Sequence, residues 1–256
     1  MYIEVNDVSV KYRQKKSEFQ ALDHVSLSVR KGEFVCLLGP SGCGKTTLLN
    51  VMAGFEKAAE GSVTIDGEEV KGPDIRYVTI FQNYGLLPWR TVRKNVELGL
   101  ETKKLPKAER SKIADQYIDL VGLGNFRNHH PHQLSGGMQQ RVAIARALAV
   151  DPEILFMDEP FGALDAITRM KLQDDVRKLS DEEKKTIVFV THDIEEAVFL
   201  ADRIVVMTPN PGKIKSIVNV QLGAARDRTS DDFIMVRDKI FEIFHMKTDR
   251  TVEYYI

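Results

Sequence analysis

The N-terminal part of the chain alternates between apolar and polar residues with a period of two. Short alternating runs are separated by turn residues such as Asp66-Gly67. This pattern predicts strands of an antiparallel sheet that buries one of its faces. The apolar positions are Ile3, Val5, Val8, Val10, Val25, Leu27, Val29, Val63 and Ile65.

The segment Phe34–Leu38 is apolar throughout, which predicts a strand buried on both faces. Gly39–Gly44 follows it, and Lys45–Ala53 has a helical pattern that ends at Gly54. Two later apolar runs predict further buried strands, namely Ile154–Met157 and Thr186–Val190.

Between residues 88 and 133 the apolar positions take a helical period. Pro106 can open a helix and Gly122 can close it. Ser135 is a potential N-cap for a second helix that runs to Val150. The apolar face expected for the first helix consists of Ile113, Tyr117, Leu120 and Val121.

After Pro209 the chain shows a Pro-Gly turn, a strand pattern near Ile214–Val220 and one more amphipathic helix. The apolar face of that helix consists of Phe233, Val236, Ile240 and Phe244. Together these patterns predict an α/β core interrupted by a helical insertion.

The composition narrows the class of protein. Lys plus Arg total 36 and Asp plus Glu 37, so the net charge is −1, and no basic excess points to a nucleic-acid partner. Cys36 and Cys43 provide no disulfide framework, which fits a reducing compartment. The sequence contains neither a signal-peptide pattern nor an apolar run of about 18 residues, so a cytoplasmic location is expected.

The loop from Gly39 to Thr46 matches the pattern G-x-x-x-x-G-K-[ST] between a buried strand and a helix. Its backbone N–H groups and the helix N-terminus can bind phosphates, Lys45 can reach the β- and γ-phosphates, and the hydroxyl of Thr46 can bind Mg²⁺. The sequence therefore predicts a site for ATP and Mg²⁺. The expected ATP-binding residues of the loop are Gly39, Pro40, Ser41, Gly42, Cys43, Gly44, Lys45, Thr46 and Thr47.

Two acidic residues follow the predicted strand Ile154–Met157. Ligands collect at the carboxyl ends of strands in open α/β sheets. Asp158 can order the Mg²⁺ shell there, and Glu159 can accept a proton from the attacking water. The alternative is an ordinary solvated strand end.

The run Leu134–Arg141, LSGGMQQR, opens a helix with a serine and two glycines and predicts a second anion site. This run resembles the signature motif of ATP-binding cassette (ABC) proteins, in the order that the family shows. The resemblance covers essentially the whole chain. It implies a P-loop NTPase with a mixed RecA-like core sheet, an N-terminal antiparallel β-subdomain and a helical signature subdomain.

On this resemblance residues 1–256 form a single ABC ATPase domain. Residues 1–87 and 151–208 would form the core with its β-subdomain, and residues 88–150 the signature subdomain. Residues 209–256 would form a short C-terminal extension, too short for a large regulatory domain.

The resemblance also implies roles for single residues. Tyr12 would stack on adenine, the alternative being a stray tyrosine at a strand end. Gln82 would sense Mg²⁺ and the γ-phosphate, or be an ordinary surface glutamine. His192 would hold the γ-phosphate and position Glu159 and the water.

Ser135, Gly136 and Gly137 would contact the ATP held by the other subunit of a head-to-tail homodimer. Leu164 and Asp165 resemble the family's dimer-contact loop. Two copies would therefore enclose two ATP molecules.

The run Phe81–Val96, especially Leu86-Leu87-Pro88-Trp89, is similar to the nitrate, sulfonate and taurine group of ABC importers. That similarity implies two membrane permease subunits, an extracytoplasmic solute-binding protein and a place on the cytoplasmic face of the membrane. Leu86, Leu87 and Trp89 either pack in the core or line a groove for a short permease helix.

Three other functions stay open: a soluble ABC ATPase that acts on nucleic acid or ribosomes, a non-catalytic nucleotide-binding scaffold, and an importer subunit for a different solute. The thiol of Cys43 lies among the phosphate-binding amides and is expected to be reactive, so that its alkylation would abolish hydrolysis.

Overall fold

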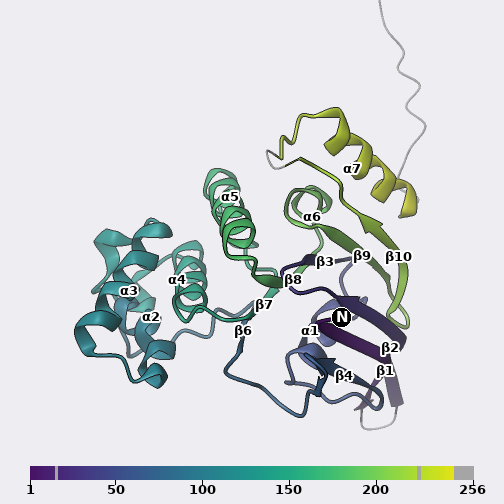
Figure 1. Ribbon diagram of the computed structural model, residues 1–256, viewed down its shortest axis with the longest axis horizontal. Coiled ribbons are helices and arrows are strands. Elements are labelled where there is room, and N and C mark those ends of the chain that lie inside the picture. The colour runs from purple at the N-terminus through teal and green to yellow at the C-terminus, as the bar shows by residue number, and fades with distance from the viewer. Residues whose placement is uncertain (15–16, 224–225, 245–256) are drawn as a thin grey trace, which may run out of the picture.

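The computed structural model describes residues 1–14, 17–223 and 226–244 and contains two sheets with seven α-helices in those residues (Figure 1). The strands are β1 Ile3–Gln14, β2 Ser17–Val29, β3 Phe34–Leu38, β4 Glu60–Ile65, β5 Glu68–Glu69, β6 Tyr77–Ile80, β7 Ile154–Asp158, β8 Thr186–Thr191, β9 Arg203–Thr208 and β10 Lys213–Asn219. The helices are α1 Lys45–Met52, α2 Val92–Leu100, α3 Lys107–Leu120, α4 Gly136–Ala149, α5 Ala166–Glu183, α6 Ile194–Leu200 and α7 Asp231–Ile243. Short 3₁₀ turns cover Glu101–Lys103, Gly124–Phe126 and Pro131–Gln133.

The larger sheet has the strand order β10-β9-β3-β8-β7-β6. Its strands are parallel except β10, which pairs antiparallel with β9. Leu38 pairs with Thr191, and Asp158 pairs with Val190. Because parallel strands end at the same edge of a sheet, the segments that follow β3, β6, β7 and β8 lie along one edge.

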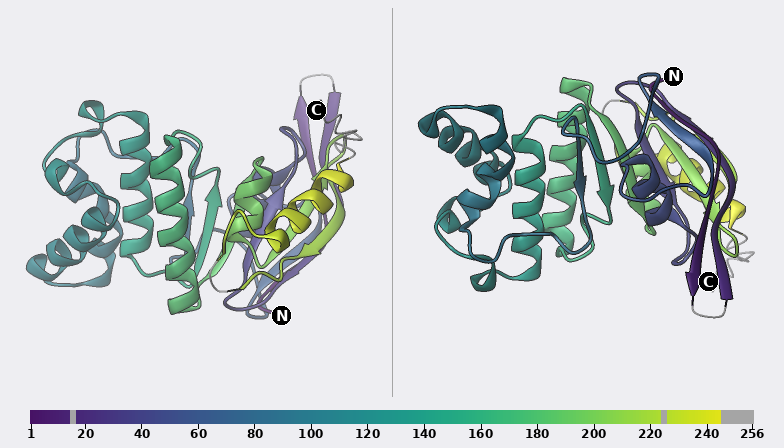
Figure 2. Two further views of the ribbon diagram at one scale, coloured as in Figure 1. Left: turned by 90° about the horizontal axis from the view of Figure 1, so that it is seen from above. Right: turned by 90° about the horizontal axis from the view of Figure 1, so that it is seen from below.

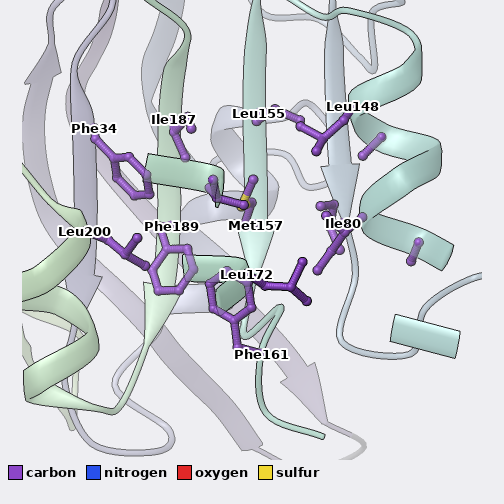
Figure 3. Close-up of a cluster of buried hydrophobic side chains, with 14 of the residues drawn as sticks. Phe34, Ile80, Leu148, Leu155, Met157, Phe161, Leu172, Ile187, Phe189 and Leu200 are labelled. Carbon is purple, nitrogen blue, oxygen red and sulfur yellow. The ribbon is translucent and has the colours of Figure 1, made fainter. Parts of the chain in front are cut away.

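The central strand β3 is buried on both faces, as its unbroken apolar run predicts. Phe34, Cys36 and Leu38 belong to the hydrophobic cluster that includes residues of α4, α5 and α6. Val35 and Leu37 belong to a second cluster, shared with α1 and the smaller sheet. Figure 3 shows part of the first cluster, including Phe34, Met157, Phe161 and Phe189.

The smaller sheet is antiparallel, with the order β2-β1-β4-β5. Every apolar position that the period of two assigns to its strands is buried. The register shifts between Val5 and Val8, where Asp7 has a φ of 53°. The predicted antiparallel sheet is therefore confirmed, and further register shifts follow between Val8 and Lys11 of β1.

Helices α2, α3 and α4 form a group beside the sheet edge at β6, on the side away from the smaller sheet (Figures 1 and 2). Ser135 is the N-cap of α4, as predicted. The predicted apolar face of α3 was wrong at Leu120, which is 39% exposed. Val121 is buried as predicted, and Ile113 and Tyr117 pack partly buried against the same cluster, while Ala114 and Ile118 are the fully buried positions within α3.

The C-terminal extension packs against α6. Arg226 donates through Nη1 to the carbonyls of Val198, Phe199 and Ala201, and through Nη2 to Asp202. These bonds satisfy carbonyls that the end of a helix leaves without an intrahelical partner. Within the described residues no helix is both long and apolar enough to cross a membrane.

Five elements have no counterpart among the predictions: β5, β6, β9, α5 and α6. β6 is an edge strand with three half-buried residues, and α6 has seven residues, too few for a clear period. Only four residues of the 18-residue α5 are buried, and two of these are polar. The hydrophobic signal of β6, α5 and α6 is therefore weak in the sequence, whereas the apolar run Ile204–Met207 of β9 was an available signal.

Candidate functional site

The loop Gly39–Gly44 links the C-terminal end of β3 to the N-terminus of α1. Gly44 has a φ of 88°, and a Cβ there would lie 2.6 Å from Leu22 and 2.9 Å from the carbonyl of Ala21. Only glycine therefore fits this turn without strain. The result is a tight loop that leads straight into a helix N-terminus, a geometry suited to phosphate groups.

The side chain of Lys45 is buried under this loop. Its Nζ donates to the carbonyl of Gly39 at 2.8 Å and to that of Pro40 at 3.0 Å. Lys45 is only 5% exposed, so its charge lies within the concave side of the loop rather than in bulk water. A charge held there fits a polyanionic ligand such as a triphosphate.

Thr46 and Asp158 meet at the carboxyl end of β7. The Thr46 hydroxyl donates to Oδ1 of Asp158 at 3.0 Å and lies 3.1 Å from Oδ2. Burial raises the pKa of Asp158, while the hydrogen bond from Thr46 opposes that shift. A hydroxyl beside a buried carboxylate is an oxygen donor set that fits Mg²⁺.

Glu159 and His192 also meet at this edge. His192 Nδ1 lies 3.1 Å from Oε1 of Glu159. The N–H of Glu159 donates to the carbonyl of Val190 in β8 at 3.1 Å. Glu159 has a φ of 46°, an uncommon conformation for a residue with a side chain. The structure thus brings together the predicted acid pair and the predicted histidine through the register of β7 and β8.

Tyr12 and Gln82 lie at two margins of this site. The hydroxyl of Tyr12 is 3.4 Å from both Oγ1 of Thr47 and Oε2 of Glu56. The ring therefore lies against the start of α1, beside the phosphate loop. Gln82 is exposed just beyond β6, the strand next to β7.

The LSGG segment forms a separate site. Ser135 Oγ accepts from the N–H of Met138 at 3.3 Å and caps α4. A hollow of about 320 Å³ opens beside it, and Asp165 at its other side caps α5. The N-terminus of α4 and Arg141 favour an anion in this hollow, whereas Asp165 places a carboxylate at its other side. The lining residues are Ser135, Gly136, Gly137, Met138, Arg141, Ala163, Leu164, Asp165 and Thr168.

The phosphate loop and the LSGG segment are not brought together within one chain. None of the residues that line the hollow at Ser135 comes from Gly39–Thr47. Each chain thus presents two distinct surfaces suited to phosphate.

The expectation of a reactive thiol at Cys43 was wrong. Cys43 is fully buried beneath the loop, and burial raises its pKa. The thiolate is the reactive form, so a raised pKa and lack of access both slow alkylation. The thiol packs closely against Gly39. A Cβ at position 39 would lie only 2.7 Å from Sγ of Cys43.

Three polar residues that the sequence analysis did not single out fix the loops of the site. Gln140 in α4 bonds to the turn after Glu159. Arg146 in α4 donates to the carbonyls of Tyr84 and Gly85, which follow Gln82 in the sequence. Asn95 in α2 bonds to the backbone of Leu87, Arg90 and Thr91. A polar residue on the buried side of a helix was the available signal for Gln140 and Asn95.

A family model described as "ABC transporter" matches residues 22–162. An uncharacterized ABC transporter ATP-binding protein of Methanocaldococcus jannaschii is 53% identical over 94% of this chain and 90% of its own length. The aliphatic sulfonates import ATP-binding protein SsuB of Bacillus thuringiensis is 41% identical over 95% of this chain and 96% of its own. The bicarbonate transport ATP-binding protein CmpC of Synechococcus elongatus is 48% identical over 83% of this chain, which spans 32% of that protein.

Among solved structures, a dimeric post-hydrolysis state of the ATP-binding cassette MJ0796 bound to ADP and phosphate matches with a TM-score of 0.80. It is 37% identical and covers 86% of this chain and all of its own. The predicted fold class is therefore confirmed. The chain belongs to the ABC transporter family as an ATP-hydrolysing cassette that powers transport, with ATP and Mg²⁺ as its cofactors.

Proposed function

We propose that two copies of this chain bind two ATP molecules between them and drive an importer for a small anion. The observation that carries the proposal is the convergence of Lys45, Thr46, Asp158, Glu159 and His192 along one sheet edge, with a second anion site at the start of α4. Neither surface suffices alone to enclose a nucleotide.

The chemistry follows from these positions. Lys45 binds the β- and γ-phosphates, and Thr46, Gln82 and Asp158 would hold Mg²⁺, which would neutralise charge on the phosphates. Glu159 accepts a proton from the attacking water. His192, 3.1 Å from the Glu159 carboxylate, orients that carboxylate and contacts the γ-phosphate.

The second copy completes each site. Ser135, Gly136 and Gly137 of one copy contact the triphosphate bound by Lys45 of the other, and Leu164 and Asp165 line the same hollow. The solved cassette to which this chain is similar is a dimer with ADP and phosphate, which supports this arrangement.

The permease contact is proposed at the segment before α2. Trp89 is 72% exposed. The side-chain amide of Asn95 forms hydrogen bonds with the backbone of Leu87 and Arg90, which lie on either side of Trp89 in the sequence. Leu86, by contrast, packs against the main hydrophobic cluster. Of the two alternatives, core packing suits Leu86 and a partner contact suits Trp89.

The anion class rests on the relatives. One relative imports aliphatic sulfonates and another transports bicarbonate, both small anions. Together with the similarity of the Leu86–Trp89 segment, they support a nitrate-, sulfonate- or taurine-type solute. An extracytoplasmic binding protein would deliver it to two permease subunits, with this chain at the cytoplasmic face.

The test is co-expression with a candidate permease pair and its binding protein, followed by reconstitution in liposomes. We expect the loaded binding protein to raise the ATPase rate and to drive uptake of the labelled anion. Stimulation by DNA or ribosomes, with no response to the permease, would favour the rival function on nucleic acid.

Replacing Trp89 by alanine should weaken the contact with the permease. We expect at least roughly tenfold weaker stimulation, since a large exposed aromatic residue is a typical interface hot spot. Basal ATPase activity should stay unchanged, because Trp89 lies outside the nucleotide site. Ile75→Ala is the matched control: Ile75 is 75% exposed and is not in the proposed contact. Equal losses in both variants would contradict the assignment.

A further inference from the structure

Gln140 lies in the second turn of α4, five residues after the N-cap Ser135, and is 2% exposed. Its Nε2 donates to the backbone carbonyl of Glu159 at 3.2 Å. Its Oε1 accepts from the backbone N–H of Ala163 at 3.1 Å. A single buried amide therefore spans the turn from Glu159 to Ala163.

This amide is one of few restraints on Glu159. The N–H of Glu159 bonds to Val190 in β8, and its carbonyl also accepts from Gly162 within the turn at 3.3 Å. With a φ of 46°, Glu159 has an uncommon backbone conformation that its surroundings must maintain. The side chain of Gln140 ties this backbone to the helix that carries the LSGG segment.

A glutamine is chemically suited to this position. The turn offers a carbonyl acceptor at Glu159 and an N–H donor at Ala163, and a neutral amide matches both. An apolar side chain would leave two polar groups without this partner in a buried place. A carboxylate would match only the N–H.

We propose that Gln140 is a positioning residue for ATP hydrolysis, which holds the Glu159 carboxylate in register with the signature helix α4. The inference rests on the proposed role of Glu159 as the base. A shift of α4 moves both the site at Ser135 and the side-chain amide of Gln140. Through the hydrogen bond of that amide, the shift also displaces the backbone of Glu159. Hydrolysis depends in this way on the placement of the helix that contacts the partner's ATP.

The test replaces Gln140 by methionine, which has a similar length and lacks the amide. We expect kcat to fall on the order of tenfold, because a small displacement of a reacting group is costly. The Kd for MgATP, measured by calorimetry, should stay within about twofold, because Lys45 and Thr46 keep their contacts. An unchanged kcat, or a Kd that rises as much as kcat falls, would overturn the inference.

Gln140→Glu separates the two hydrogen bonds. Glutamate can still accept from Ala163 but, when ionised, cannot donate to Glu159. A fall in kcat like that of Gln140→Met supports the bond to Glu159 as the one that matters. A kcat equal to that of the parent would contradict it.

Gln173→Met is the matched control, because it also replaces a buried glutamine by methionine and removes its side-chain amide. Gln173 is 3% exposed in α5, and its Nε2 donates to Oε1 of Glu196 at 2.8 Å. Thermal unfolding, monitored by circular dichroism, identifies a temperature at which all variants are folded, and the kcat values are compared at that temperature. We expect Gln173→Met to be destabilised yet to keep its kcat. An equal loss of kcat there would mean that the Gln140 effect is general loosening.

Glu159→Gln, measured beside these variants, distinguishes the two ways of failing. If Glu159→Gln hydrolyses ATP like the parent, the base is misassigned and the inference falls with it. If Glu159→Gln is inactive while Gln140→Met turns over normally, only the positioning role of Gln140 is wrong.

Discussion

Replacing Glu159 by glutamine is expected to lower the kcat of ATP hydrolysis roughly 100-fold or more, the usual contribution of a positioned general base. Glutamine keeps the size of the side chain and can still hydrogen-bond to His192, which lies 3.1 Å from the carboxylate. It cannot accept the proton of the attacking water. The measurement is phosphate release at saturating MgATP.

Loss of hydrolysis with ATP binding intact should also trap the closed dimer. Lys45, Thr46 and Asp158 do not depend on the Glu159 carboxylate for their contacts, so MgATP should still bind. Light scattering after gel filtration should then show dimers with ATP and monomers with ADP. Glu195→Gln, at an exposed carboxylate in the first turn of α6, is the control and should behave like the parent. Normal turnover in Glu159→Gln would rule out Glu159 as the base.

The second large effect concerns the sharing of each site between two copies. Lys45→Ala removes the ammonium group buried under the phosphate loop, and Ser135→Arg places a bulky side chain at the mouth of the hollow at α4. We expect each variant alone to lose roughly 100-fold in activity, as when a key electrostatic contact of an active site is removed. Ser135→Arg should fold, since loss of an N-cap costs only about 1 kcal/mol.

Mixing the two variants should restore activity. In a mixed dimer both defects fall on one of the two sites, and the other site combines an intact Lys45 with an intact Ser135. ATP hydrolysis and filter retention of labelled ATP should both rise above the values of either variant alone. If the mixture binds no more ATP than the separate variants, the two elements do not serve one nucleotide across an interface.

The hollow beside Ser135 explains why such complementation is expected of this molecule. It is lined by residues of α4, the turn after Phe161 and the start of α5, and by none from the phosphate loop. The hydrogen bond between Thr46 and Asp158 lies on the other surface. We therefore propose that one chain alone offers two incomplete sites, which two chains placed head to tail would complete.

Some features of this protein were determined by the sequence alone. The phosphate loop, the acid pair and the LSGG segment are each a run of neighbouring residues. The chemistry of each motif, and its place at the end of a strand or the start of a helix, can therefore be read from the sequence. Every apolar position that the period of two assigned to the smaller sheet is buried in the structure. Local backbone preference and local alternation of polarity suffice for such features, because they depend on residues close in sequence.

Other features were decided only by the tertiary structure. Val121 at the end of α3 is buried and Leu120 is not, because the positions of α2 and α4 select the face that packs. Cys43 is fully buried in the second hydrophobic cluster, where burial raises the pKa of its thiol. The two backbone partners of Gln140 lie about 20 residues away, beyond β7. Burial and hydrogen-bond partners of this kind depend on segments that meet only in the folded chain, and no local pattern encodes them.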